Sequence, residues 1–217
     1  VDPQAALTAA VSYAKRGWYV APVNVSYNAA GKKTVSFLVD WGTEQSNDID
    51  VVRDWYVQRP YAGIAILTKK SGLVGIDLDY KEGAVDGLGA WYDLCARYGN
   101  GEIPETLTHR TPTGGLHLIF TDPEGRARNS ASSLAPGIDV RGAGNSAGGA
   151  LFAPPTRTSK GAYAVESDVE PVPLPEWVWA LIEKDGRAAG VGAAGVGAAG
   201  QRDSLFDDDI FHGTAAD

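Results

Sequence analysis

The stretch GLVGIDLDY, residues 72–80, constrains the fold most strongly, because it sets two acidic residues into an otherwise apolar, strand-forming run. Side chains alternate along a strand, so Asp77 and Asp79 face one side while Ile76 and Leu78 face the other. Two carboxylates about 7 Å apart on one face repel each other, and a divalent cation between them is the commonest remedy. Taken alone, the pattern is also typical of two solvent-facing aspartates at the end of a strand.

A second segment with one polar face is TPTGGLHLIF, residues 111–120. Its turn residues lead into a strand whose large apolar side chains face one way while His117 faces the other. The paired glycines Gly114 and Gly115 let the backbone pass close to a ligand, and an imidazole just beyond them can bind a phosphate or a metal. In isolation, the same pattern also describes an ordinary histidine on a sheet.

The third segment is GIDVRGAG, residues 137–144. Asp139 and Arg141 share one face of this strand, with Ile138 and Val140 on the other. One interpretation is a simple ion pair between neighbouring strands. Beside a metal site, however, Asp139 becomes a third ligand, and Arg141 can reach phosphates that the metals leave uncovered.

The remaining pattern predicts a single domain of mixed helices and strands, of the α/β (α+β) class. Asp2 and Pro3 suit the start of a first helix that Gly17 ends, and residues 26–33 have hairpin-turn chemistry. The other expected helices follow Asp48 and cover about 84–98 and 173–184. The expected strands are 18–23, 63–68, 73–79, 107–110, 115–120, 137–141, 149–153 and 162–165.

The character of the chain changes after Arg187. Residues 188–200, AAGVGAAGVGAAG, repeat small side chains that cannot build a core, so they predict a flexible tether. We therefore expect a folded domain over residues 1–186 and a Gly/Ala-rich linker with an acidic tail over 187–217. The tether is either a disordered tail or, as we expect, a linker to a further domain.

The net charge of −8 at first argues against a nucleic-acid partner, because such proteins usually carry basic patches. The acids are concentrated in the tail, however, where residues 167–217 hold ten acids and three bases. The rest of the chain is nearly neutral, and residues 110–160 hold six bases and three acids. A local field matters more than the net charge for binding a polyanion, so nucleic acid stays open as a partner.

Taken in order, the Asp-x-Asp, Gly-Gly-x-His and Asp-x-Arg segments resemble the bifunctional DNA primase–polymerase (prim-pol) domain of the archaeo-eukaryotic primase superfamily. The similarity extends to ALTAAVSYAKRGWYVAPV near the start, GKK at 31–33, DVVRDWYVQRPYAGIAILT before the acidic strand and GGALFAPPTRTSKGAY after it. It thus covers roughly residues 5–165. The ordered set is specific, whereas each piece alone is not.

The resemblance implies a primase-polymerase fold, with an RRM-like catalytic half and an α/β N-terminal half. It also implies a template-directed nucleotidyl transferase, acting as a DNA primase, a DNA polymerase or both. Two divalent ions, Mg²⁺ or Mn²⁺, would be held by Asp77, Asp79 and Asp139, and His117 would complete the catalytic set by contacting the incoming triphosphate. The expected nucleotide-binding residues are His117, Arg141, Thr113, Gly114 and Gly115. No zinc is expected, because the single Cys95 cannot build the cysteine-rich zinc stem of some relatives.

The expected partners are a DNA template and nucleoside triphosphates. The resemblance also implies replication of a phage or plasmid, with a helicase domain in cis after the linker. Candidate DNA contacts are Lys32, Lys33, Arg110, Arg126, Arg128, Arg157 and Lys160. Lys32 and Lys33 can equally be exposed turn charges, and His109 lies just outside the expected site. Cysteine usage and the lack of an export signal or a membrane-spanning run lead us to expect a cytoplasmic protein, in the host cytoplasm if phage- or plasmid-encoded.

Three alternatives stay open at this point. Another metal-dependent enzyme can use the Asp-x-Asp pattern, such as a nucleotide-sugar transferase. A metal-dependent nuclease would use the same carboxylates. A non-catalytic module that binds nucleic acid or nucleotide could keep the fold without the reaction, although such a module has no need for three carboxylates.

Overall fold

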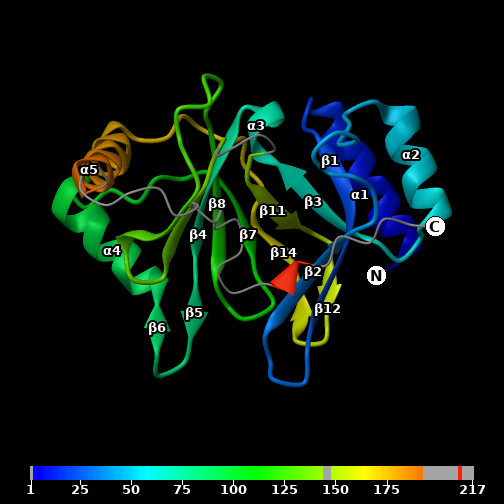
Figure 1. Cartoon of the computed structure of the whole chain (residues 1–217), viewed down its shortest axis with the longest axis horizontal. Coiled ribbons are helices and arrows are strands. Elements are labelled where there is room, and N and C mark those ends of the chain that lie inside the picture. Colours follow the sequence, from blue (N-terminus) through cyan, green and yellow to red (C-terminus); the bar gives the residue numbers. More distant parts are fainter. Residues whose placement is uncertain (1, 144–147, 193–209, 212–217) are drawn as a thin grey trace.

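The computed structural model describes residues 2–143, 148–192 and 210–211. Two sheets form the body of the molecule, and helices cover the outer side of each (Figure 1). The sheet of the N-terminal half, sheet A, is covered by α1 (Pro3–Lys15) and α2 (Ile49–Gln58). The other, sheet B, is covered by α4 (Gly87–Tyr98) and α5 (Glu176–Gly192). The expected α+β fold is confirmed.

Sheet A has the strand order β11-β3-β1-β2-β15. All of its pairs are antiparallel except β15 with β2. Asn28 stabilises the turn between β1 and β2, because its side chain accepts hydrogen bonds from the backbone N–H groups of Ala30 and Lys32. The strands are β1 (Val20–Tyr27), β2 (Lys33–Phe37), β3 (Gly63–Leu67), β11 (Ala150–Ala153) and β15 (Ile210–Phe211).

Both helices on sheet A begin where the sequence predicts. Asp2 caps α1 by accepting a hydrogen bond from the Gln4 N–H group, with a proline in the first turn. Asp48 caps α2 in the same way, through the N–H groups of Asp50 and Val51. These caps fix the helix ends, and the apolar sides of both helices then pack on sheet A.

Sheet B has the order β14-β7-β8-β4-β10-β9, and all of its pairs are antiparallel. Helix α4 carries the chain from β4 to β7, a hairpin leads to β8 between them, and β10 pairs on the far side of β4. This split β-α-β arrangement is that of an RRM-like sheet. The strands are β4 (Leu73–Leu78), β7 (Leu107–Arg110), β8 (Leu116–Thr121), β9 (Ser130–Ala135), β10 (Ile138–Arg141) and β14 (Ala164–Ser167).

The two faces of sheet B carry different kinds of side chain. Its outer face presents buried residues such as Ile76 and Phe120, which pack with Trp91 of α4 and with α5. Its inner face meets β11, the edge strand of sheet A, and Gly75 leaves room for Leu151 there. A Cβ atom added to Gly75 would lie 2.5 Å from the Leu151 side chain, so only glycine permits this approach. The polar side chains of the candidate site lie on this inner face.

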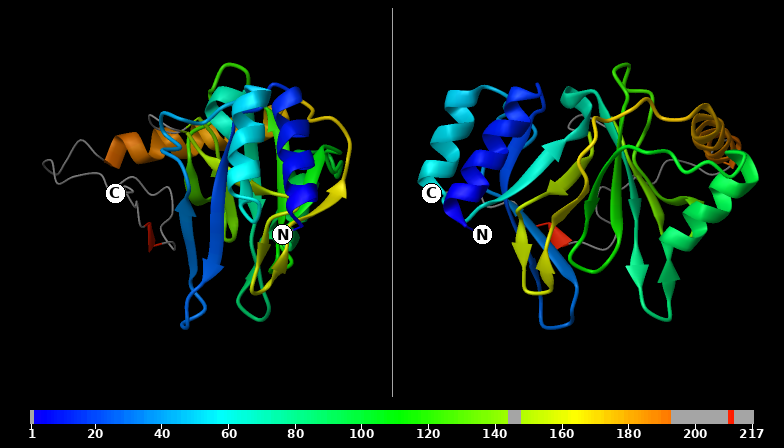
Figure 2. Two further views of the ribbon diagram at one scale, coloured as in Figure 1. Left: turned by 90° about the vertical axis from the view of Figure 1, so that its right-hand side faces the viewer. Right: turned by 180° about the vertical axis from the view of Figure 1, so that it is seen from behind.

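Three hairpins project from one end of the molecule in both the front view and the view from behind (Figures 1 and 2). They are the β1–β2 hairpin, the β5–β6 hairpin (Tyr80–Lys81 and Val85–Asp86) and the β12–β13 hairpin (Arg157–Thr158 and Gly161–Ala162). The β5–β6 hairpin takes residues that the sequence assigned to the start of a helix. Helix α4 begins only at Gly87, where the Asp86 side chain accepts a hydrogen bond from the Gly89 N–H group. A short helix, α3 (Thr68–Ser71), joins β3 to β4.

Helix α5 continues to Gly192, so residues 187–192, which we expected to begin the tether, are helical. The repeat beyond Gly192 and most of the acidic tail lie outside the described residues, apart from β15. The proposed division of the chain at residue 186 stays a prediction. None of the described helices is both long and apolar enough to cross a membrane.

Candidate active site

Four polar side chains form one row across sheet B. The register places Asp139 of β10 opposite Asp77 of β4, Asp77 opposite His117 of β8, and His117 opposite His109 of β7. Residues opposite each other in neighbouring strands point to the same face, with Cβ atoms about 5 Å apart. The structure therefore brings together residues that are more than 60 positions apart in the chain. Three of them, Asp77, His117 and Asp139, are among the predicted catalytic residues.

Arg141 lies between the two paired carboxylates. Its Nη2 atom is 2.8 Å from Asp139 Oδ2 and 3.6 Å from Asp77 Oδ2. Asp139 is also held from its other side, because its Oδ1 atom accepts a hydrogen bond of 2.8 Å from the Ser132 N–H group. The sequence predicted that Asp139 and Arg141 share a face, and the structure adds Asp77 as a second contact of the same guanidinium.

The charges of these groups differ with their surroundings. Burial acts to raise the pKa of Asp77, but contact with the His117 imidazole and the charges of Arg141 and Lys33 together outweigh it, so the net shift is downward. Burial raises the pKa of Asp139, only partly opposed by Arg141. We conclude that Asp77 is the most firmly ionised carboxylate of the row.

Asp79 lies one residue beyond the end of β4, and its side chain is exposed. Partial loss of hydration, together with repulsion from Asp77 and Asp139, raises its pKa to about 6. The second aspartate of the Asp-x-Asp pattern is thus close enough to both buried carboxylates to be destabilised by them. A cation bound among the three would relieve that repulsion.

His117 is neutral in this setting. Burial lowers the pKa of its imidazole, against the opposing effect of Asp77, whose Oδ1 atom lies 3.5 Å from His117 Nε2. The ring of Tyr163 lies beside it, with 5.6 Å between ring centroids, and Tyr163 in turn contacts Phe152 of β11 at 6.1 Å. Residues from sheet A and from the segment before β14 therefore hold the imidazole in place.

Lys33 is a site residue that sequence reasoning did not place there. It begins β2, on the other sheet, and its Nζ atom lies 5.8 Å from the centroid of the Phe152 ring. Its charge also acts to lower the pKa of Asp77, Asp79 and Asp139. The hint in the sequence was only the GKK turn, read as exposed charge or a template contact.

His109, which the sequence placed just outside the expected site, is the fourth member of the row. It lies beside His117 with only 1% of its surface exposed, and burial lowers its pKa to about 3. Neither of its ring nitrogens has a hydrogen-bond partner among the described residues. It is therefore a neutral imidazole in the interior, behind His117 and next to the Tyr13 ring of α1, at 6.3 Å.

The loop at 111–115 closes the β7–β8 hairpin beside the row. Gly115 packs against the backbone of β4, since an added Cβ atom would lie 2.3 Å from the Leu78 carbonyl oxygen. Gly114 has a φ of +93°, which favours glycine. The Thr113 hydroxyl lies 3.3 Å from that of Thr111. The predicted nucleotide-binding residues Thr113, Gly114 and Gly115 thus form a tight turn next to His117.

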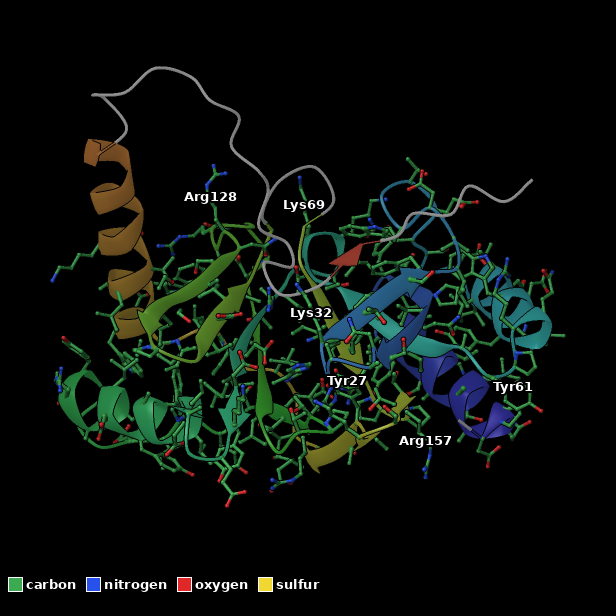
Figure 3. All side chains as sticks on the ribbon, turned by 60° about the horizontal axis from the view of Figure 1, so that its bottom comes forward. Tyr27, Lys32, Tyr61, Lys69, Arg128 and Arg157 are labelled. Carbon is green, nitrogen blue, oxygen red and sulfur yellow. The ribbon has the colours of Figure 1, made fainter. Side chains whose placement is uncertain are left out.

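The candidate DNA contacts separate into two sets. Lys160 links the β12–β13 hairpin to the β1–β2 hairpin, because its Nζ atom donates to the Gly31 carbonyl at 3.3 Å and lies 4.1 Å from the centroid of the Tyr27 ring. Figure 3 shows Lys32 and Arg157 around Tyr27, on the same side of the molecule. These two hairpins thus gather Lys32, Lys33, Arg157 and Lys160.

The other three arginines do not belong to either of these hairpins. Arg110 pairs with Glu166 of β14 at 2.6 Å, and Arg126 pairs with Glu183 of α5 at 2.9 Å while lying over the Trp179 ring. Arg128 projects from the surface away from the two hairpins (Figure 3). Arg126 and Arg128 are thus outside the hairpin cluster, whereas Arg110 lies opposite Ala164, two residues beyond the β12–β13 hairpin.

The donor set fits a hard divalent cation. Asp77 Oδ2 and Asp139 Oδ2 both contact one nitrogen atom, so a single cation can reach both, and carboxylate oxygens are the ligands that Mg²⁺ and Mn²⁺ prefer. In the described part of the chain, no three His, Cys, Asp or Glu side chains are already arranged as a metal centre. Asp79, exposed just beyond the end of β4, would be the third donor.

The α+β fold and the acidic row are shared by several kinds of metal-dependent enzyme, and comparison with known families shows to which family the chain belongs. Residues 10–177 match the family model described as bifunctional DNA primase/polymerase, N-terminal, and the chain belongs to that family. The match covers more than half of the 217 residues and confirms the resemblance noted in the sequence. A search of curated proteins found no match.

Proposed function

We propose that this domain joins nucleoside triphosphates on a DNA template, with Asp77, Asp79, Asp139 and His117 as its catalytic residues. The observation that carries the proposal is the row of carboxylates and a neutral imidazole on the inner face of sheet B. Family membership supports DNA primase or polymerase chemistry at a general level. We place this activity in the replication of a phage or plasmid, with a helicase domain after residues 187–217.

The three carboxylates would hold two divalent cations, Mg²⁺ or Mn²⁺. Such ions, when bound, make the attacking 3′-hydroxyl more acidic and neutralise charge on the leaving pyrophosphate. Asp139 is already oriented by the Ser132 N–H group, and Asp77 is held ionised by its cationic neighbours. Asp77 is therefore prepared to bind a cation without a prior proton loss, and Asp139 is already oriented.

The remaining site residues would position the triphosphate. His117 is neutral, so one ring nitrogen carries a proton that it can donate to a phosphate oxygen. Lys33 faces the same region from sheet A and would add a positive charge there. The glycines of the 111–115 turn let the nucleotide approach the backbone beside His117. Together these groups would hold the phosphates for in-line attack.

The template would run past the two hairpins that carry Lys32, Lys33, Arg157 and Lys160. Four cations on adjacent hairpins suit the phosphates of a nucleic-acid strand, and Tyr27 offers a ring on which a base can stack. This cluster projects at the same end of the molecule as the 111–115 turn. A strand bound there would reach the carboxylate row.

The test is a primer-extension and de novo synthesis assay with Mg²⁺ or Mn²⁺ and labelled nucleotides. We expect Asp77→Asn to abolish product and His117→Ala to reduce it by about two orders of magnitude, while both variants stay folded. Asp54→Asn is the matched control, because Asp54 is an exposed carboxylate on α2 outside the site. Normal synthesis by a folded Asp77→Asn variant would refute the assignment. Sugar transfer without DNA, or DNA degradation without triphosphates, would identify one of the other metal-dependent activities.

A further inference from the structure

The position of Arg141 bears on how the site binds a metal ion and a nucleotide. One atom, Nη2, lies 2.8 Å from Asp139 Oδ2 and 3.6 Å from Asp77 Oδ2. The three side chains are only 16%, 12% and 11% exposed for Arg141, Asp139 and Asp77. The guanidinium is therefore the cation that these two carboxylates share.

A metal ion bound between the same two oxygens needs the space that this nitrogen occupies. Mg²⁺ sits about 2.1 Å from each oxygen ligand, which is closer than any guanidinium contact. A divalent ion at that position would also repel the guanidinium strongly at short range. The Arg141 ion pairs and a metal ion shared by Asp77 and Asp139 thus exclude each other.

Of the two partners, Arg141 is the one that can move. Asp139 is fixed by the Ser132 N–H group at its other oxygen, and Asp77 is a buried residue in the middle of a four-strand row. Arg141 is the last residue of β10, on a long side chain with several rotatable bonds. When it leaves the carboxylates it loses two ion pairs, unless another anion takes their place.

We propose that Arg141 couples metal binding to nucleotide binding. The triphosphate is the anion that takes over the guanidinium, in the bidentate manner that arginine uses for phosphates, and this frees Asp77 and Asp139 for the metal. Metal alone has to displace Arg141 without that compensation and binds weakly. The two ligands therefore strengthen each other's binding, a reciprocity that thermodynamic linkage requires. This inference rests on the proposed function, since it assumes that the carboxylates hold a metal.

The replacement Arg141→Gln predicts two effects of opposite sign. Mn²⁺ alone should bind about 10- to 100-fold more tightly than to the wild type, because no ion pair has to be broken. A fluorescent deoxynucleoside triphosphate in the presence of Mn²⁺ should bind about tenfold more weakly, because the phosphate contact is lost. A merely structural role for Arg141 would weaken both.

Binding of Mn²⁺ without nucleotide is measured from the electron paramagnetic resonance signal of the free ion, and nucleotide binding from fluorescence anisotropy. Arg53→Gln is the matched control, since Arg53 also pairs with a carboxylate, that of Asp50 at 2.7 Å, but lies on α2 outside the site. It should change neither affinity. Arg141→Lys, which keeps the charge but loses the planar fork, should fall between wild type and Arg141→Gln for Mn²⁺, and it serves if the glutamine variant does not fold.

The outcomes separate this inference from the proposed function. Mn²⁺ binding that depends on Asp77, but is unchanged or weaker in the folded Arg141 variants, would overturn the coupling and leave the metal site standing. Absence of Asp77-dependent Mn²⁺ binding in every variant would overturn both. Tighter Mn²⁺ binding with weaker nucleotide binding would establish the coupling.

Discussion

The replacement His109→Leu should make this protein more stable, and more so in acid. His109 is 1% exposed, and neither ring nitrogen has a hydrogen-bond partner among the described residues. A buried polar group without a partner costs about 1–3 kcal/mol, and leucine removes that cost at similar size. At pH 8 we therefore expect a gain of about 1–3 kcal/mol, or roughly 2–12 °C in Tm for a chain of this length.

The pH dependence follows from the direction of the pKa shift. In the folded protein the pKa of His109 is lowered from 6.5 to about 3, so between these values the unfolded chain binds more protons than the folded one. Stability is therefore lost as the pH falls below about 6.5. At pH 5 this amounts to about 2 kcal/mol for the wild type, which the leucine variant does not lose through this residue.

Both the gain in stability at pH 8 and its increase at pH 5 are measured by urea unfolding in EDTA at the two pH values, with circular dichroism as the readout. Thr108→Val is a control, since Thr108 is a neighbouring buried polar residue that does not titrate, and its effect should be the same at both pH values. The reasoning would be refuted if His109→Leu lowered stability at pH 8, or if its advantage did not grow at pH 5. The first result would mean that the imidazole makes a favourable polar interaction, for example with a buried water.

Three further predictions concern the surroundings of the site. Asp79→Asn should raise Tm at pH 8 in EDTA by up to about 2 °C. The pKa of Asp79 is about 6 in the folded protein against 3.8 unfolded, so the ionised carboxylate lowers the stability of the folded protein above pH 6. Solvent screening keeps the gain in Tm small, and the gain should shrink at pH 5. Gly115→Ala should cost about 1–3 kcal/mol in urea unfolding, because the new methyl group meets the Leu78 carbonyl; an unchanged midpoint would contradict the close packing of β4 and β8. Arg110→Gln should lower the free energy of unfolding by less than about 1 kcal/mol, since its pair with Glu166 is on the surface; a larger loss in urea unfolding would contradict this assessment of the pair.

Alternation along single strands was sufficient to predict which residues share a face. It placed Asp77 with Asp79 and Asp139 with Arg141, and it put His117 opposite the large apolar side chains of its strand. It could not predict which strands pair, because pairing depends on register between segments far apart in the chain. The row that joins β10, β4, β8 and β7 therefore became visible only in the structure.

Residues contributed by the other sheet escaped prediction for a related reason. Lys33 belongs to β2, a strand of sheet A, and lies beside the ring of Phe152 of β11, the strand by which sheet A meets sheet B. Strand β9 was also missed, because its sequence SASSLA is polar and lies at a sheet edge, without the alternation that marks a half-buried strand. Likewise, a contact between Arg141 and Asp77 requires the cross-strand distance, which no pattern within one strand contains.

The order in which the two sheets receive their strands has a consequence for synthesis of the protein. The chain leaves sheet A after β3, builds most of sheet B, and returns to add β11 beside β3. A ribosome must therefore produce residues 150–153 before the exposed edge of β3 gains its neighbour. Sheet A therefore cannot be completed before most of sheet B has been synthesised, whereas sheet B needs no strand from before β4. A gene divided between β3 and β4 would leave sheet A without β11 and β15, while the second fragment would carry every strand of sheet B.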